Sequence, residues 1–253
     1  MDLIFDIGNS NIVISWVKNN VWIPPKRVKT NRKLPEVYYR NLLSILSLEH
    51  GLNFGEIEKV VISSVVTEVT DLVATAIQYY YGKDPIILDG KLFSNLDMSV
   101  KRPYEIGSDL VSNAYCVFKE YEGDHIIVDF GTALTFTILK ANEGIQGVTI
   151  APGLKTSINA LSRGTSKLPE VPLELPGSVV GHNTTHAIQA GVLYGYIGLV
   201  KEILSRIKTE LGSHYKVVAT GGLREVLKEL REEFDEVDEL LTLKGIQLLG
   251  RES

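Results

Sequence analysis

The sequence predicts an α/β protein made of two similar halves, because three apolar strands each end in a glycine-containing segment. The first segment is DIGNSN at residues 6–11, and the second is DFGTA at residues 129–133, about half a chain length later. The third is TGG at residues 220–222. The first two share an Asp, one apolar residue, a glycine and then small hydrogen-bonding residues. This repeat predicts that each half offers a carboxylate and a glycine turn to one cleft.

The predicted element order βββαβα occurs in both halves. Apolar runs predict strands in the first half over residues 3–5, 12–17, 21–23, 60–65 and 85–88. Helical spacing of apolar residues predicts helices over residues 35–49, 67–81 and 108–121. Asn19 and Asn20 form a candidate hairpin turn. Residues 89–106 lose this periodicity, which predicts a long loop of the kind that often has a function.

The second half repeats this order. Its predicted strands cover residues 125–129, 134–139, 147–150 and 215–219. Its predicted helices follow Gly153 to about residue 161 and then cover residues 184–211, 223–232 and 242–249. Gly191, Gly195 and Gly198 lie on one face of the long helix, which favours close packing against another helix.

Composition limits the possible functions of the chain. Its 253 residues are enough for one large domain or two halves with a real core. The net charge of −5 argues against a surface that binds nucleic acid. The single cysteine, Cys116, excludes an intramolecular disulfide. The start of the chain lacks the basic region of a signal peptide, and no apolar run approaches the roughly 20 residues of a membrane span. We therefore expect a cytoplasmic protein that binds neither membrane nor nucleic acid.

The first Asp-Gly turn has the chemistry of a phosphate site. Its backbone N–H groups and the side chains of Asn9, Ser10 and Asn11 can hold phosphate oxygens. Gly8 is expected to let the backbone approach closely and to adopt a positive φ. Asp6 would hold a hydrated Mg²⁺. Neither a GxxxxGK[ST] loop nor a GxGxxG fingerprint occurs. The alternative for a single copy is a plain turn between strands.

The Gly221-Gly222 pair stands between a strand and a predicted helix. Such a junction gives a flat backbone surface and a helix N-terminus, both of which suit a nucleotide. A simple strand–helix turn is an equally good interpretation of this segment alone.

In this order, the three glycine segments resemble those of the actin-like, sugar-kinase and Hsp70 ATPase fold. A longer set of motifs resembles type III pantothenate kinase over residues 3–249. These motifs are DIGNSN, GSDLVSNA, DFGTALTF, APG, SRGTSKLP, HNTTHAIQAGVLYG, ATGG and LTLKG.

The resemblance implies a fold of two ribonuclease H-like halves, residues 1–115 and 116–253, with ATP between them. It implies ATP-dependent phosphorylation of pantothenate to 4′-phosphopantothenate, the first step of coenzyme A biosynthesis. It also implies Mg²⁺, a monovalent cation (K⁺ or NH₄⁺) and a homodimer.

The resemblance further implies a role for each matching residue. Asp109 would be the base that accepts the proton of the pantothenate hydroxyl, and backbone N–H groups at the start of its helix would hold it ionised. Asp129 would bind the monovalent cation and Asp6 the Mg²⁺. The ATP-binding residues would be Asp6, Ile7, Gly8, Asn9, Ser10, Asn11, Ile12, Val13, Thr132, Gly221 and Gly222. The pantothenate-binding residues would be Tyr104, Gly107, Ser108, Asp109, Leu110 and Thr184, the last across the dimer interface. A plain helix cap is the alternative for Asp109.

Two departures from the family pattern concern the substrate pocket. Leu110 replaces an arginine, which physical expectation makes the partner of the pantothenate carboxylate; losing such a contact costs about 1.5–3 kcal/mol. Lys101 and Arg102 lie just upstream and are candidate substitutes. Residues 147–150 read GVTI where the family has a second glycine. These departures leave two alternatives open, a non-catalytic nucleotide-binding paralogue with a regulatory role and a related kinase for another small alcohol.

Overall fold

The computed structural model describes residues 1–52, 54–164, 169, 171–222 and 228–252. Contacts divide the chain into two compact units. The first unit comprises Met1–Tyr121 with Leu240–Ser253, and the second comprises Glu122–Glu239. The last helix of the chain thus belongs to the first unit. The sequence-based division into ribonuclease H-like halves at residues 115 and 116 stays a prediction.

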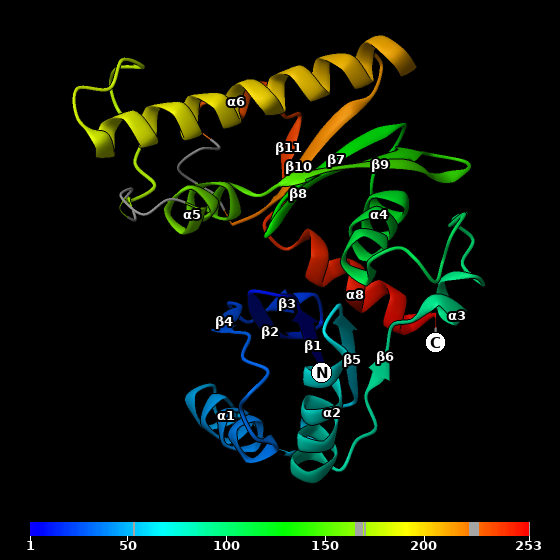
Figure 1. Cartoon of the computed structure of the whole chain (residues 1–253). Helices are drawn as coiled ribbons and strands as arrows, with labels where there is room; N and C mark the ends of the chain where they lie inside the picture. The colour runs from blue at the N-terminus through cyan, green and yellow to red at the C-terminus, as the bar shows by residue number, and fades with distance from the viewer. Residues whose placement is uncertain (53, 165–168, 170, 223–227, 253) are drawn as a thin grey trace. The chain divides into compact units, whose positions relative to one another are not determined.

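The first unit contains one mixed sheet with the strand order β3-β2-β1-β5-β6 (Figure 1). Its strands are β1 Asp2–Ile7, β2 Asn11–Lys18, β3 Val21–Trp22, β4 Lys26–Lys29, β5 Lys59–Ser64 and β6 Ile86–Ile87. The central strand β1 is antiparallel to β2 and parallel to β5. β4 pairs with β2 in antiparallel orientation. The carboxyl ends of β1 and β5 therefore meet at one edge of the sheet.

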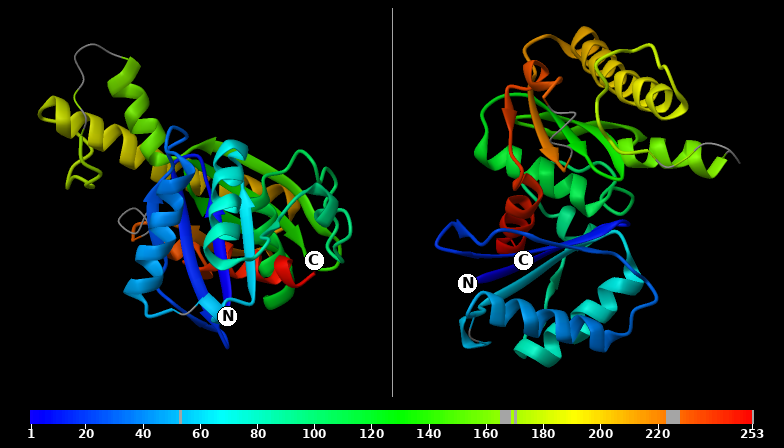
Figure 2. Two further views of the ribbon diagram at one scale, coloured as in Figure 1. Left: turned by 90° about the horizontal axis from the view of Figure 1, so that it is seen from below. Right: turned by 90° about the vertical axis from the view of Figure 1, so that its left-hand side faces the viewer.

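Helices cover both faces of this sheet, as Figures 1 and 2 show. The helices are α1 Glu36–Glu49, α2 Thr67–Tyr81, α3 Gly90–Phe93, α4 Ser108–Glu120 and α8 Leu241–Arg251, with a 3₁₀ turn at Phe54–Glu56. α1 and α2 share a hydrophobic core with Leu3, Phe5 and Ile62. α8 packs on α4 and on strands β1 and β5 from the opposite face, where Gly250 touches Val61. Asp6 alternates with Phe5 along β1 and so lies on the α4/α8 face.

The second unit repeats the strand order as β9-β8-β7-β10-β11. Its strands are β7 His125–Phe130, β8 Ala133–Lys140, β9 Gly144–Pro152, β10 Lys216–Gly221 and β11 Glu236–Val237. Its helices are α5 Leu154–Gly164 and α6 Thr184–Leu211, with a 3₁₀ turn at Arg231–Glu233. β7 is antiparallel to β8 and parallel to β10, as β1 is to β2 and β5. The duplicated topology predicted from the sequence is therefore present in both sheets.

The structure departs from the predicted elements at a few places. The short strands β4 and β11 were not predicted, and the predicted loop at residues 89–106 begins with the short helix α3. Of the predicted helix over residues 223–232, the first five residues lie outside the described chain, and a turn and the 3₁₀ segment follow. By length and composition alone α6 could cross a membrane, but one such helix is only weak evidence of a membrane span. A helix of a protein core passes the same test.

Candidate active site

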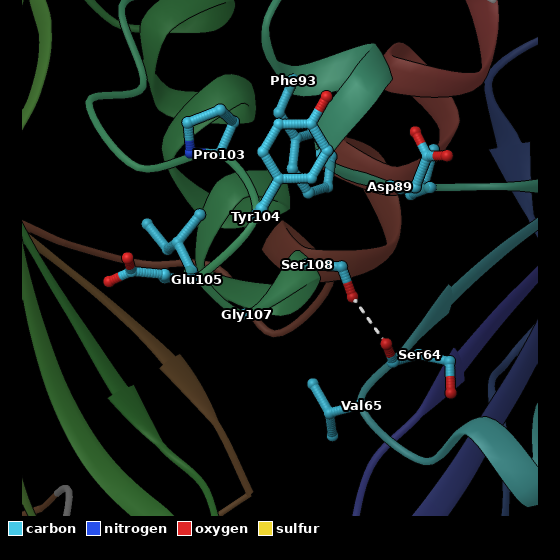
Figure 3. Close-up of a pocket in the computed structure, with 12 residues that line it drawn as sticks. Ser64, Val65, Asp89, Phe93, Pro103, Tyr104, Glu105, Gly107 and Ser108 are labelled. Atoms are coloured by element: carbon cyan, nitrogen blue, oxygen red, sulfur yellow. Dashed lines mark hydrogen bonds between the residues drawn. The ribbon is translucent and has the colours of Figure 1, made fainter.

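The first part of the candidate site lies where β1 and β5 end beside the start of α4. Asp6 is opposite Ser63 in the parallel register of these strands. The Ser63 and Ser108 hydroxyls are 2.8 Å apart. The Ser108 hydroxyl also donates to the Ser64 carbonyl at 3.3 Å, the contact drawn as a dashed line in Figure 3. Ser63 and Ser108 are both buried. This hydroxyl network fixes the N-terminus of α4, and with it Asp109, against the strand next to Asp6.

Asp109 is half-buried in the first turn of α4. Its Oδ1 accepts a hydrogen bond from the Leu110 N–H at 2.9 Å. Burial raises the pKa of the Asp109 carboxyl, and the backbone N–H groups of Asp109 and Leu110 oppose this effect. The expected N–H contact exists, but burial outweighs it. A carboxylate with a raised pKa is a better proton acceptor, which suits a general base.

Gly107, the N-cap residue of α4, makes room for this carboxylate. A Cβ atom at residue 107 would collide with Asp109 Oδ1. In its present position the Asp109 side chain therefore leaves no space for a Cβ atom at residue 107.

A cavity of about 270 Å³ opens beside this network (Figure 3). Three of the predicted pantothenate-binding residues, Tyr104, Gly107 and Ser108, line it. The Tyr104 ring packs against Gly90, where a Cβ atom would collide with it. Leu110 is buried, with 9% of its surface exposed, and is not among the lining residues. The lining residues include the acids Asp89 and Glu105 but neither Lys nor Arg.

The predicted phosphate turn connects β1 and β2. The Gly8 N–H donates to the Asn11 carbonyl at 2.9 Å. Gly8 does not have the positive φ expected from the sequence, but a Cβ atom there would lie 3.3 Å from the Asn11 carbonyl oxygen, which is a tight contact. Asn9 and Ser10 are exposed, so their polar groups face solvent where a ligand can reach them. The turn therefore leaves little space for a Cβ atom at residue 8, although its backbone angle is open to other residues.

The second unit has an equivalent turn after β7. Asp129 is opposite Thr135 on β8 and Thr220 on β10, so the three side chains share one sheet face. The Thr135 hydroxyl is buried and has no hydrogen-bond partner among the described residues. The Thr132 carbonyl accepts hydrogen bonds from the Gly153 N–H at 3.1 Å and the Thr156 hydroxyl at 2.7 Å. The turn is thus held against the start of α5.

The glycine pair lies next to this turn. Gly221 has φ 102°, in the region that favours glycine, and a Cβ atom there would lie 2.7 Å from the Phe130 carbonyl oxygen. The Gly222 N–H donates to the same carbonyl at 3.4 Å. The second unit therefore places Asp129, Thr132, Gly221 and Gly222 around the carboxyl ends of β7 and β10.

Thr184 lies at the start of α6, whose N-cap Asn183 accepts a hydrogen bond from the His186 N–H at 2.9 Å. Thr184 is exposed and lines a second cavity of about 700 Å³, together with Leu161 and Ile188. This cavity is formed by other elements than the Asp129 turn.

The sequence and the fold agree with known proteins. The sequence model of the type III pantothenate kinase family matches residues 2–206. The chain belongs to the type III pantothenate kinase family. Type III pantothenate kinases of Exiguobacterium sp. (strain ATCC BAA-1283 / AT1b) and Geotalea uraniireducens (strain Rf4) are each 36% identical over 249 residues. The matches cover 98% of this chain and 98% and 97% of these relatives.

Solved structures support the fold. The solved structure of an activator of 2-hydroxyisocaproyl-CoA dehydratase from Clostridium difficile with bound ADPNP is similar, with a TM-score of 0.52 and 15% identity. The match covers 97% of this chain and 90% of that one. Pantothenate kinase membership confirms three predictions from the sequence: the actin-like ATPase fold, the kinase class and pantothenate phosphorylation in coenzyme A biosynthesis.

Sequence reasoning missed the residues of this type III pantothenate kinase that position the site. Ser63 and Ser64 anchor α4, and the Thr30 hydroxyl donates to the Gly8 carbonyl at 2.6 Å. Gly90 supports Tyr104. Small polar residues at strand ends were the available signal, but only the folded sheet shows which of them meet.

Proposed function

We propose that this pantothenate kinase uses the Asp6 turn to hold ATP and Asp109 to activate the substrate hydroxyl. The observation that supports this most directly is the hydrogen bond between Ser63 and Ser108, since Ser63 is opposite Asp6 and Ser108 precedes Asp109. The two carboxylates are therefore held at one sheet edge. Asp109 accepts the proton while the pantothenate oxygen bonds to the γ-phosphorus and the bond to the ADP oxygen breaks.

Asp6 would hold the Mg²⁺ that accompanies ATP, and that ion would neutralise phosphate charge. Asp6 is half-buried at a strand end, and few protein carboxylates are needed because Mg²⁺ keeps most of its waters. Exposed amide and hydroxyl groups at Asn9 and Ser10 add phosphate contacts. Thr132, Gly221 and Gly222 would also contact ATP.

The cavity beside Ser108 would take pantothenate, with Tyr104 as one wall. Asp109 is not among the lining residues, but it follows Ser108 in the first turn of α4. The carboxylate of pantothenate needs a cationic partner, and the residues that line the cavity include neither Lys nor Arg. Arg102 donates to Glu105 Oε2 at 3.0 Å, and Glu105 lines the cavity, so a single side chain links Arg102 to it. We propose Arg102 as the partner of the carboxylate, in place of the arginine that Leu110 replaces.

Arg102→Ala is therefore expected to raise KM for pantothenate about tenfold or more, because a charge-assisted contact contributes about 1.5–3 kcal/mol. Steady-state kinetics with saturating ATP measures this change. Lys91→Ala removes a nearby exposed charge and is the control. An unchanged KM in Arg102→Ala would exclude Arg102 from this role.

The monovalent cation would bind at Asp129. The Thr135 hydroxyl, which has no hydrogen-bond partner among the described residues, lies on the same sheet face and would be a second hard oxygen ligand. No group of three or more His, Cys, Asp or Glu side chains that could hold a metal ion occurs in the described part of the chain. One carboxylate with neutral oxygens suits a singly charged ion better than a dense carboxylate cage does.

The homodimer would form through α6. Gly191, Gly195 and Gly198 are exposed, and a Cβ atom at each would touch nothing within 4 Å. Such an open glycine face allows the backbones of two helices to approach closely. Thr184, exposed on the same helix, would then reach the pantothenate of the partner.

Size-exclusion chromatography with light scattering tests this interface. We expect twice the 28.0 kDa chain mass for the natural protein and a monomer for Gly195→Leu, because the larger side chain blocks close approach. Thr75→Leu, on the exposed surface of α2 in the first unit, is the control and is expected to stay dimeric. A natural protein of 28.0 kDa in solution would contradict the proposal.

A coupled ADP-release assay tests the function as a whole, with pantothenate and then with other small alcohols. Turnover with pantothenate, stimulated by K⁺ or NH₄⁺ over Na⁺, is expected. ATP binding without turnover of any alcohol would support the regulatory paralogue, and turnover of another alcohol alone would support the related kinase. We place this activity in the cytoplasm, where its substrate ATP is made.

A further inference from the structure

A basic segment follows the β2–β3 hairpin of the first unit. Residues 26–33 read KRVKTNRK, with five Lys or Arg residues and no acid. The whole chain has 31 acidic and 26 basic residues, so this segment opposes the overall charge. Its first four residues form β4, and all of its charged side chains are exposed.

The basic segment is bound directly to the first Asp-Gly turn. Thr30 donates from its hydroxyl to the Gly8 carbonyl at 2.6 Å and from its N–H to the Ser10 carbonyl at 3.1 Å. Arg32 donates from Nη2 to Asn9 Oδ1 at 3.2 Å. Three consecutive residues of the turn are therefore tied to this segment.

Strand alternation divides the cations of β4 between the two sheet faces. Val28 packs on the hydrophobic core of α1 and α2, and Lys26 on the same face pairs with Glu49 of α1 at 3.4 Å. Arg27 and Lys29 lie on the opposite face. That face also carries Asp6 and receives α4.

The register brings these two cations near the turn. Arg27 pairs with Val13, which in turn pairs with Asp6, so Arg27 and Asp6 lie in one row across three strands. Lys29 pairs with Asn11, the residue whose carbonyl closes the Gly8 turn. Among the described residues neither Arg27 nor Lys29 has an ion pair with an acid.

We infer that Arg27 and Lys29 are the cationic contacts for the terminal phosphates of ATP, which rests on the proposed placement of ATP at the Asp6 turn. The turn itself carries no Lys or Arg, although a triphosphate needs charge neutralisation beyond one metal ion. The neighbouring strand supplies two uncompensated cations on the correct face. They replace the lysine that other phosphate-binding loops carry within the loop.

Single charge-neutralising variants on one strand test this inference. Arg27→Gln and Lys29→Gln are each expected to weaken ATP binding about tenfold or more, with a smaller loss for ADP and none for AMP. Lys26→Gln, one residue away on the opposite face, is the matched control and should bind all three nucleotides as the natural protein does. Isothermal titration at fixed Mg²⁺ and ionic strength measures these affinities, and KM for pantothenate should not change.

Two further outcomes separate this inference from the function on which it rests. Asp6→Asn is expected to lose turnover with Mg²⁺-ATP. If it does, and Arg27→Gln and Lys29→Gln bind ATP normally, only the role of the basic segment is overturned. If Asp6→Asn keeps its turnover, the site itself is misplaced and the inference fails with it. If Lys26→Gln loses as much ATP affinity as Arg27→Gln and Lys29→Gln do, the effect comes from bulk charge, and the inference is also overturned.

Discussion

Asp109→Asn is expected to lower kcat by about 10²–10⁴-fold while leaving the affinity for ATP unchanged, because a general base contributes to proton transfer and not to nucleotide binding. The variant keeps the shape of the side chain, and its amide oxygen can still accept the hydrogen bond from the Leu110 N–H. Single-turnover kinetics with pantothenate and titration with ATP measure the two quantities. A variant that keeps most of its rate would show that Asp109 is only a residue of the first helical turn.

The thermal stability of Asp109→Asn distinguishes a loss of catalysis from a loss of folding. Burial raises the pKa of Asp109 above its value in the unfolded chain, so the folded protein binds this proton more tightly. The free energy of unfolding therefore falls as the pH rises through the titration of this carboxyl. At neutral pH the ionised form of Asp109 lowers the stability of the folded protein. Asparagine carries no such cost. Asp109→Asn should melt at or above the temperature of the natural protein at pH 7.

Gly153→Ala is expected to destabilise the second unit by about 1–3 kcal/mol and to raise KM for ATP. The added Cβ atom would collide with the Gly131 carbonyl oxygen and lie 2.5 Å from that of Thr132. Both atoms belong to the backbone of the second Asp-Gly turn, so relief requires the turn to move. Calorimetry should show a melting temperature lower by about 2–12 °C.

Gly147→Ala is the matched control for this change. Gly147 lies on β9 in the same unit, and a Cβ atom there would meet nothing within 4 Å. The control is expected to melt and to bind ATP as the natural protein does. Equal behaviour of the two variants would show that the contact between Gly153 and the turn has no role in either property.

Elements with strong local signals could be predicted from the sequence. The predicted bounds of α2 and α6 agree with Thr67–Tyr81 and Thr184–Leu211. Both helices combine apolar spacing with a local end signal: Gly82 has φ 64° after α2, and Asn183 caps the start of α6.

Elements that depend on distant partners could not be predicted. β4 has a single apolar residue, Val28, and exists because it pairs with β2. β11 has two residues and depends on β10 in the same way. The sign of the Asp109 pKa shift was also out of reach, since the amount of burial around a carboxyl is a property of the packed chain.

Motif reasoning predicted glycine-containing segments at the ends of β1, β7 and β10, where the structure has them, but it could not predict which residues pack beside them. The Ser63–Ser108 hydrogen bond joins residues 45 positions apart. The link from Thr30 to Gly8 spans 22 positions. Neither residue pair has a sequence pattern of its own, and both follow from which strands become adjacent.

The packing of α8 in the first unit has a consequence for synthesis on the ribosome. Gln247 donates to Asp2 Oδ2 at 2.9 Å, and Lys59 donates to the Gly250 carbonyl at 2.8 Å, so the last helix is bonded to the beginning of the chain. The sheet made first lacks the helix that covers part of one face until residue 251 has emerged. The second unit is one continuous segment of the chain, so all its residues are synthesised before α8. In this protein the first unit is completed by a helix that is synthesised after the whole of the second unit.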